Sequence, residues 1–389
     1  MTQLRITVTN TSEIGGTFLT PVYFGFHDGS FDLFDRGEAV SPGLEQLAED
    51  GAATILADER RAADADSQGI VVTGAGGPVA TQETTSALID VDGLSNGTVA
   101  YGAMIIPSND AFIGTAEGVQ LFSDSGRFLG AHLSTITGAQ VYDAGTEVNT
   151  EMDAAFINQE GPNTGEDENG VVTLHPGFNG SLGNPGGDQI ILGGTNAAGA
   201  FIDPVAADFT RPGAQIAEIH INLAVETTLD AGGDRFFGAR ADDLVTGGTG
   251  NDLVFGGAGW DVLDGGDGED RLFGGAGKDA LSGGADRDVL HGGGGDDTLS
   301  GGTGDDLLIG AGGNDTFVFG TGDGIDTVFD FRAGDVVTLA VEGISSFADL
   351  EAVASDEGRL LSFDLGGGDE LRFFGTDLAD LSEGDFLFA

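Results

Sequence analysis

Apolar and polar residues alternate along several stretches of the first 226 residues. Two of them, LRITVTNTS (4–12) and AQIAEIHINLAV (214–225), have the period of two that half-buried strands show, and VAYGAMIIPS (99–108) is a further predicted strand. This alternation, separated by loops rich in Gly, Asn and Pro, predicts an all-β sandwich with irregular insertions for this part of the chain.

A single short helix is predicted in the same part, over SPGLEQLAEDG (41–51). Ser41 is placed to cap it, Pro42 lies in its first turn and Gly51 follows its end. Residues 158–200 are dominated by turn formers, so we expect long loops with short strands there.

From residue 238 onward a nine-residue unit replaces these patterns. Residues 247–255 read GGTGNDLVF, and the following units, GGAGWDVLD and GGDGEDRLF, again have Asp sixth and an apolar residue eighth. An internal repeat of fixed short period indicates a solenoid. The apolar eighth residues are Val245, Val254, Leu263, Leu272, Leu281, Leu290, Leu299, Leu308 and Phe317. An earlier, degenerate unit has Asp234 and Phe236 in the same phase.

The spacing predicts how the units fold. The Gly-rich half allows a tight turn, partly at positive φ, and directs carbonyl oxygens inward. The second half forms a short strand with its apolar side chain in the core, and two units make one coil. The sixth-position aspartates should then stack in two ladders. The first ladder consists of Asp243, Asp261, Asp279, Asp297 and Asp315, and the second of Asp252, Asp270, Asp288 and Asp306.

The chemistry of these ladders favours calcium. Each carboxylate would lie between stacked coils, where carbonyl and carboxylate oxygens can build a six-coordinate cage made only of oxygen. Such a cage is typical of a Ca²⁺ site. Without the ion, the aspartates of one ladder would repel one another, so we expect the segment to be disordered in the absence of calcium.

The GGxGxDxUx pattern resembles the repeats of the RTX (repeat-in-toxin) family. The resemblance implies a parallel β-roll that binds several Ca²⁺ ions and is exported by type I secretion machinery through an uncleaved C-terminal signal. The sequence departs from the pattern at Ala241 and Asp286, which replace the fourth-position Gly, and at Ala311, which replaces a second-position Gly. We therefore expect the first and last coils to bind the ion weakly or not at all.

The region after the repeats predicts a cap for the solenoid. A short helix is expected around 346–354, followed by two hairpin-like runs, LLSFDL (360–365) and DELRFFG (369–375). A solenoid needs such a cap to cover its exposed last coil. The region resembles the cap and secretion signal of RTX proteins, and a small independent C-terminal domain is the alternative.

Three motifs of the first part resemble the N-terminal domain of spondins. They are HDGSFDLFDRGEAVSPGLEQLAEDG (27–51), IIPSNDAFIG (105–114) and YDAGTEV (142–148). That family implies a β-sandwich with one Ca²⁺ held by three acidic residues, which correspond here to Asp110, Asp143 and Glu147. Glu147 departs from the family's aspartate, and the alternative is that all three are solvated loop acids. The predicted domains are a spondin-like sandwich (1–226), an RTX β-roll (227–320) and a C-terminal cap with the secretion signal (321–389).

The amino-acid composition limits the classes of binding partner that we expect. With 65 acidic and 14 basic residues the chain has a formal net charge of −51, which disfavours nucleic acid and anionic membranes and favours cations. A hydrophobic content of 40%, with 26 Phe, argues against disorder. There is no Cys, hence no disulfide or thiolate metal site. The start shows no signal-peptide pattern, and no apolar run reaches the roughly 18 residues of a membrane span.

No motif predicts catalysis. The sequence has no HExxH, and its five His residues, at 27, 132, 175, 220 and 291, are isolated from one another. GLSNG (93–97) has the form G-x-S-x-G, but turns flank Ser95 and a strand is expected after it, unlike a nucleophile elbow. The run GAGK lacks the Ser or Thr that a phosphate-binding loop has after its lysine, here Lys278.

The sequence therefore predicts a non-enzymatic Ca²⁺-binding protein that is secreted or associated with the cell surface. Its first domain would be an adhesion or recognition module for an unknown extracellular ligand, whether glycan, matrix component or protein. One alternative is a secreted hydrolase with its site in the loops of 158–200. Another is a structural protein that self-assembles in a surface layer or matrix.

Overall fold

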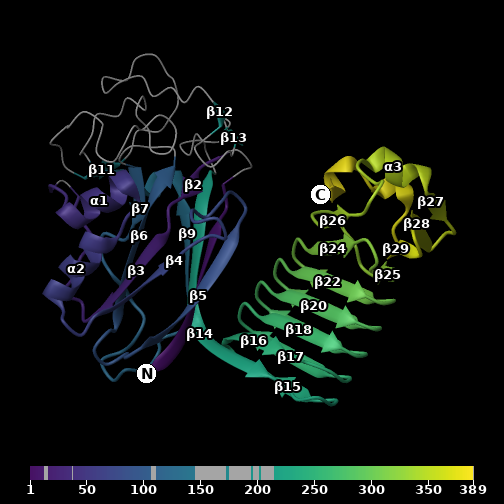
Figure 1. Ribbon diagram of the computed structural model, residues 1–389, viewed down its shortest axis with the longest axis horizontal. Helices are drawn as coiled ribbons and strands as arrows, with labels where there is room; N and C mark the ends of the chain where they lie inside the picture. Colours follow the sequence, from purple (N-terminus) through teal and green to yellow (C-terminus); the bar gives the residue numbers. More distant parts are fainter. Residues whose placement is uncertain are drawn as a thin grey trace. The chain divides into compact units, whose positions relative to one another are not determined.

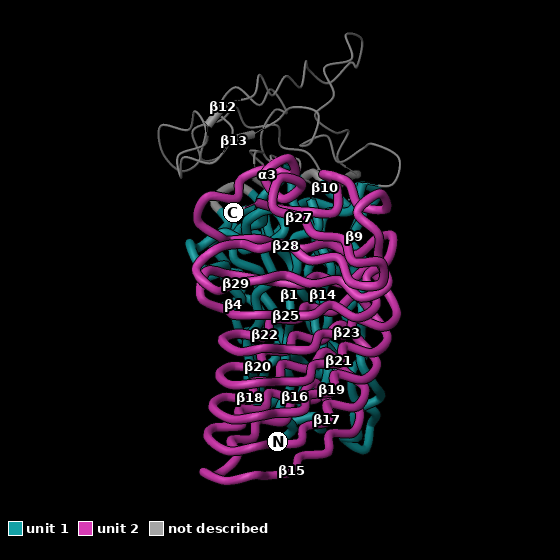
Figure 2. Tube along the Cα trace, turned by 90° about the vertical axis from the view of Figure 1, so that its right-hand side faces the viewer, with its two compact units in different colours: residues 1–222 teal, residues 223–389 magenta. Residues whose placement is uncertain are grey.

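Strands dominate the computed structural model of the chain, as the alternating patterns predict (Figure 1). The structure describes residues 1–12, 16–36, 38–106, 111–144, 172–174, 194–195, 201–202 and 214–388. The chain divides into two units, Met1–Asn222 and Leu223–Ala389, coloured separately in Figure 2. Within the described ranges no helix is long and apolar enough to cross a membrane.

The first unit contains two large β-sheets, which confirms the predicted sandwich. One sheet has the order β9-β14-β1-β5, and the other has the order β11-β10-β7-β6-β3-β4, with β2 and β8 also paired to β6. Leu4, Ile6 and Val8 of the first sheet and Phe24 and Phe26 of the second are fully buried. The strands of the first sheet are β1 (Thr2–Asn10), β5 (Thr84–Val91), β9 (His132–Thr137) and β14 (Gln215–Thr228). Those of the second are β2 (Phe18–Leu19), β3 (Val22–His27), β4 (Gln68–Val72), β6 (Thr98–Ile106), β7 (Ala111–Gly114), β8 (Val119–Gln120), β10 (Val141–Asp143) and β11 (Thr173–Leu174). A separate pair consists of β12 (Gly194–Thr195) and β13 (Phe201–Ile202).

Two helices cover the second sheet. Helix α1 (Pro42–Asp50) confirms the predicted helix, because the Ser41 side chain accepts the Leu44 N–H and Gly51 ends it at φ 67°. Helix α2 (Thr54–Ala63) was not predicted, and the expectation of a single helix in this part of the chain is wrong. Ala53, at the N-cap of α2, offers no capping side chain, so the sequence lacks the usual signal. Gln46 Oε1 of α1 accepts the Ile55 N–H instead, and the buried Leu56 packs the helix onto the sheet.

The second unit is the predicted parallel solenoid, whose coils stack one above another in Figure 2. Strand pairing runs through two sheets, and residues 18 apart in the repeats lie side by side, as in Leu263 beside Leu281. Two nonapeptides therefore make one coil, as expected. One sheet contains the end of β14, then β16 (Asp242–Thr246), β18 (Val262–Asp267), β20 (Ala280–Ala285), β22 (Thr298–Thr303), β24 (Thr316–Gly320), β26 (Val336–Ala340) and β30 (Phe386–Phe388). The other contains β15 (Arg235–Phe237), β17 (Leu253–Ala258), β19 (Arg271–Ala276), β21 (Val289–Gly294), β23 (Leu307–Gly312), β25 (Ile325–Val328), β29 (Asp369–Phe374), β28 (Leu360–Gly366) and β27 (Ala354–Asp356).

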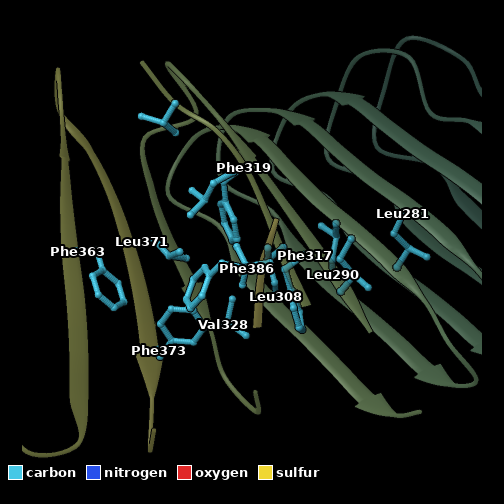
Figure 3. Packing of buried hydrophobic residues seen from close by; sticks show 14 of the residues in the cluster. Leu281, Leu290, Leu308, Phe317, Phe319, Val328, Phe363, Leu371, Phe373 and Phe386 are labelled. Carbon is cyan, nitrogen blue, oxygen red and sulfur yellow. The ribbon is translucent and has the colours of Figure 1, made fainter. Parts of the chain in front are cut away.

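A narrow apolar core runs through the solenoid and widens at its C-terminal end. Each repeat contributes its eighth residue, and all nine of these side chains are buried. Beyond the repeats the core gains Phe319, Phe363, Phe373 and Phe386, which Figure 3 shows packed beside the last coils. The hairpin of β28 and β29 and the helix α3 (Phe347–Ala352), capped by Ser346, close this end. The helix and hairpin predicted for the cap are therefore present.

Candidate functional site: the aspartate ladders of the roll

The two predicted ladders of aspartates are formed, and one hydrogen bond repeats along each. In both ladders the Oδ1 atom of an aspartate accepts the backbone N–H of the aspartate 18 residues earlier. Asp261 Oδ1 accepts from Asp243 N at 2.8 Å, and Asp279 Oδ1 accepts from Asp261 N at 2.9 Å. In the second ladder Asp270 Oδ1 accepts from Asp252 N at 2.7 Å. The parallel register of the strands therefore fixes one oxygen of each carboxylate.

The second oxygen of these carboxylates has no such partner. Seven aspartates of the ladders have a buried Oδ2 atom without a hydrogen-bond partner, although each residue is at most 3% exposed. They are Asp252, Asp261, Asp270, Asp279, Asp288, Asp297 and Asp306. An unpaired buried charge is strongly unfavourable, and proteins normally pair such a group or use it to bind a metal. The ladders thus present a row of oxygens that require a cation.

Backbone carbonyls supply further oxygens at the same place. A Cβ atom added to Gly274, the first residue of its repeat, would lie 2.4 Å from Asp279 Oδ2 and 2.7 Å from the carbonyl oxygen of Gly292. At Gly256 the equivalent atom would lie 2.2 Å from Asp261 Oδ2 and 2.8 Å from the Gly274 carbonyl oxygen. Glycine at the first position therefore leaves a small space that a carboxylate and the next coil's carbonyl both face.

Electrostatics point to the same requirement. Burial, together with the charges of neighbouring ladder aspartates, raises the pKa of Asp261 to about 8 and the pKa of Asp279 to about 7, although backbone N–H donors lower both in part. Burial likewise raises the pKa of Asp288 in the second ladder to about 7. These raised values mean that the fold does not by itself stabilise the ionised carboxylates, which a bound cation would do.

The donor set fits calcium. The spaces are lined by carboxylate and carbonyl oxygens, the ligands that Ca²⁺ takes at a coordination number of about 6 to 8. Among the described residues no three His, Cys, Asp or Glu side chains converge as a metal cluster. A site here would therefore depend on backbone carbonyls as well as aspartates, which is the arrangement that the glycine positions provide. Bound Ca²⁺ would supply the positive charge that the orphaned Oδ2 atoms lack.

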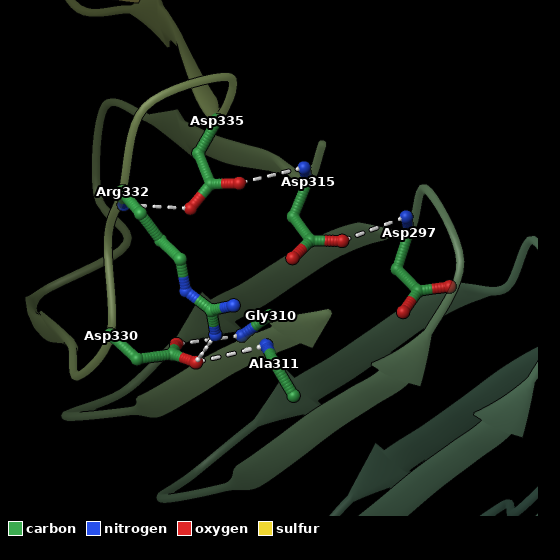
Figure 4. A network of polar contacts seen from close by, with 7 residues as sticks. All are labelled: Asp297, Gly310, Ala311, Asp315, Asp330, Arg332 and Asp335. Carbon is green, nitrogen blue, oxygen red and sulfur yellow. Dashed lines mark hydrogen bonds and ion pairs between the residues drawn. The ribbon is translucent and has the colours of Figure 1, made fainter. Parts of the chain in front are cut away.

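The structure adds two aspartates to the ladders that the sequence reasoning missed. Asp326 Oδ1 accepts from Asp306 N, and Asp335 Oδ1 accepts from Asp315 N, both at 3.0 Å. Figure 4 shows the run from Asp297 through Asp315 to Asp335. Two inserted residues make the spacing 20 instead of 18, so a count by nine passes over them. The signal that could have found them is an aspartate two residues before a buried valine, Val328 or Val337.

The three departures from the repeat pattern behave differently. Asp286 and Ala311 adopt the left-handed backbone of the glycines that they replace, each with φ 72°, whereas Ala241 has no positive φ. At Ala311 and its neighbour Gly310, the backbone N–H groups donate to Asp330, each at 3.0 Å (Figure 4). The turns therefore keep their shape at 286 and 311. Weak or absent ion binding by the first and last coils stays a prediction.

The second predicted calcium site falls mostly outside the described residues. Asp110 and Glu147 are not among them, and only the backbone of Asp143 is described. Asp143 ends β10 and pairs with Ala111, the residue that follows Asp110 in the sequence. The strand register therefore brings Asp143 beside the start of β7, and the predicted site of Asp110, Asp143 and Glu147 stays a prediction.

His27 and Ser95 each form local hydrogen bonds. His27 is buried, and its Nδ1 atom accepts the backbone N–H of Gly29 at 3.0 Å, whereas its Nε2 atom is buried without a hydrogen-bond partner. Ser95 lies in a turn before β6, where its N–H bonds to the Asp92 carbonyl and its hydroxyl lies 3.4 Å from Asp92 Oδ2. The turn that was expected around Ser95 is thus present.

Stacked parallel coils with aspartate and glycine oxygens facing each other define a calcium-binding β-roll. In agreement, the family model for the RTX calcium-binding nonapeptide repeat matches residues 229–263, 255–290 and 291–326. The family model Spondin_N matches residues 17–163 in the first unit. The chain therefore carries a spondin N-terminal domain followed by RTX calcium-binding repeats.

Among solved structures, the chain is similar to the extracellular lipase LipA from Serratia marcescens. The two are 19% identical, and the match covers 43% of this chain and 42% of the lipase chain at a TM-score of 0.20. The match thus spans less than half of either chain, and a score this low carries no argument about activity. No curated protein matches the chain.

Proposed function

We propose that the chain is a secreted protein whose roll folds when it binds Ca²⁺ after type I secretion, and whose first unit is an adhesion or recognition module. RTX repeats indicate calcium binding, and their family implies secretion. The observation that carries the proposal is the row of seven buried Oδ2 atoms without hydrogen-bond partners.

The proposed mechanism is linkage between ion binding and folding. A ligand that binds only the folded state stabilises that state by an amount that grows with ligand concentration. At the low calcium of a cytosol, repulsion between ladder aspartates would keep the roll unfolded and able to thread a channel. Outside the cell, ions between the coils would pair with the Oδ2 atoms and drive folding.

The first unit is proposed to bind an extracellular glycan, matrix component or protein. The match to the spondin domain supports an extracellular role, because that domain and the RTX repeats both suggest a secreted protein. Labelled full-length chain in calcium, applied to arrays of glycans and matrix proteins, tests this proposal. Retention of the full chain with none for a chain lacking residues 1–222 is the expected result. Turnover in a panel of hydrolase substrates, without retention on any surface, would instead favour a secreted enzyme.

One further ion is proposed for the first unit, held by Asp110, Asp143 and Glu147. The pairing of Asp143 with Ala111 supports it, since Ala111 adjoins Asp110 in the sequence. Asp143→Asn should lower the number of bound calcium ions by one, as measured by calorimetric titration. The control is Asp124→Asn, which removes an exposed acid from the same unit and should leave the number unchanged.

A further inference from the structure

A buried arginine lies between helix α2 and the second sheet of the first unit. Arg60 is 2% exposed, and its Nε atom donates to the Tyr23 hydroxyl at 2.6 Å. Two glycines that pair across β3 and β4, Gly25 and Gly69, make room for it. A Cβ at Gly25 would lie 2.6 Å from Arg60 Cδ, and one at Gly69 would lie 2.9 Å from Arg60 Nη2. The sheet is therefore shaped to admit this side chain.

Among the residues that the structure describes, no acidic side chain pairs with Arg60. Its Nη1 atom is buried and has no hydrogen-bond partner. Within the described residues Tyr23, bound by Nε, is the one hydrogen-bond partner of the Arg60 side chain. The acids nearest in sequence are engaged elsewhere. Glu59 accepts from the Ser41 hydroxyl and from Gly43 N, and Asp58 pairs with Arg61. A buried guanidinium without an acidic partner is unfavourable unless something else supplies the negative charge.

A cavity adjoins this arginine. Its volume is about 260 Å³, and its walls include Tyr23, Ala57, Arg60, Arg61, Ile70 and Val71. Ile70 and Val71 belong to β4, which ends the sheet, and Val71 is 45% exposed, so the cavity lies at the surface. The walls thus combine two guanidinium groups with two apolar side chains of an edge strand. This local positive charge lies in a protein whose formal net charge is −51.

The start of α2 adds to the positive character. Ala53 and Thr54, at the start of the helix, also line the cavity; Ala53 makes no side-chain cap, and Gln46 Oε1 accepts the Ile55 N–H there at 3.1 Å. The first N–H groups of a helix carry partial positive charge and favour an anion. Burial raises the pKa of Tyr23, whereas the hydrogen bond from Arg60 and the charges of Arg60 and Arg61 lower it, so both arginines lie close to this wall.

We propose that this cavity binds the carboxylate of a small organic anion, with Arg60 as its charged hydrogen-bond donor. A guanidinium suits a carboxylate, to which it donates charge-assisted hydrogen bonds. The apolar walls from Ala57, Ile70 and Val71 suit a carbon skeleton better than a bare inorganic ion. The carboxylate can belong to a free acid or to an acidic sugar of a glycan. The site goes beyond the proposed function, because it holds whether or not the roll binds calcium.

Calorimetric titration of the full chain in calcium buffer tests the site, with sodium acetate, sodium glucuronate and glucose as probes. We expect saturable binding of one acetate or one glucuronate per chain and none of glucose. Stronger binding of glucuronate would identify the sugar acid as the source of the carboxylate, and stronger binding of acetate the free acid. Arg60→Met should weaken binding at least tenfold. The control Arg127→Met removes the same charge from an exposed turn and should bind as the parent does.

A second variant separates ligand binding from a structural role. Ala57→Asp places a carboxylate three residues before Arg60 on the same helix, within reach of its guanidinium. This internal carboxylate should exclude the probe and raise the melting temperature of the first unit. The proposal is overturned if neither acetate nor glucuronate binds, or if Arg60→Met leaves binding unchanged.

Discussion

A methyl group at Gly274 should damage one calcium site while leaving the rest of the roll in place. In Gly274→Ala the new Cβ would lie 2.4 Å from Asp279 Oδ2, and ordinary contact begins at 3.4 Å. The carboxylate must therefore move by about 1 Å. Asp279 Oδ1 also holds the Asp261 N–H at 2.9 Å, so the movement weakens that hydrogen bond as well.

The size of the effect follows from these two losses. Forcing a methyl group into filled space costs about 1–3 kcal/mol, and a hydrogen bond to a charged group contributes about 1.5–3 kcal/mol. A total of about 3 kcal/mol is a change of roughly 160-fold in the folding equilibrium. If the ladders bind about nine ions together with folding, this shifts the midpoint of a calcium titration upward by about twofold. The variant should also bind one ion fewer.

The assay is a calcium titration of the full chain followed by fluorescence of Trp260, with calorimetry for the number of ions. Trp260 is the single tryptophan of the chain and adjoins Asp261 of the first ladder, so its emission reports on folding of the roll. Gly294→Ala is the matched control, because a Cβ at Gly294 would meet nothing within 4 Å. Equal midpoints and equal ion numbers for both variants would refute the reasoning about the glycine spaces.

Substitutions at three further positions test other parts of the structure by thermal unfolding in calcium. Ala311→Gly should raise the stability of the roll by about 1–2 kcal/mol, because φ is 72° there and alanine is strained in that conformation. Asp326→Ala should lower stability by about 1–3 kcal/mol, since the buried Asp306 N–H loses its acceptor, whereas Asp326→Asn keeps an acceptor and should lose much less. Ser41→Ala should destabilise the first unit by about 1 kcal/mol through loss of the α1 cap, and no change in its melting temperature would contradict that role.

The roll could be predicted because its physics is local and repeated. A fixed Asp and a fixed apolar residue in every nine positions determine which side chains face the core and which align between coils, and Leu263 beside Leu281 follows directly. The same counting failed at Asp326 and Asp335, because two added residues shift the spacing while the parallel pairing continues. The two added residues lie in a loop, so the parallel strands still pair. A count that assumes a fixed period of nine misses both aspartates.

In the first unit the sequence predicted features that depend on neighbouring residues, such as helix caps. It did not predict features that depend on tertiary contacts. Ser41 and Gly51 mark both ends of α1 in the sequence, whereas α2 follows Ala53, which has no capping side chain, and is held by the Gln46 side chain of α1 and by packing. The setting of Arg60 could not be predicted, because Tyr23, its hydrogen-bond partner, lies 37 residues away in the sequence. Nothing in the local sequence shows that a charged residue of an amphipathic helix faces the sheet.

The central claim is that Ca²⁺ between the coils is what makes the roll fold. Its most direct test is the emission of Trp260 in the full chain, first in chelator and then during titration with Ca²⁺, with Mg²⁺ as the comparison. We expect a cooperative change in emission with Ca²⁺ and little with Mg²⁺, because Mg²⁺ is smaller, requires strict octahedral geometry and keeps its waters. Emission that is the same in chelator and in saturating Ca²⁺, with the roll folded in both, would contradict it.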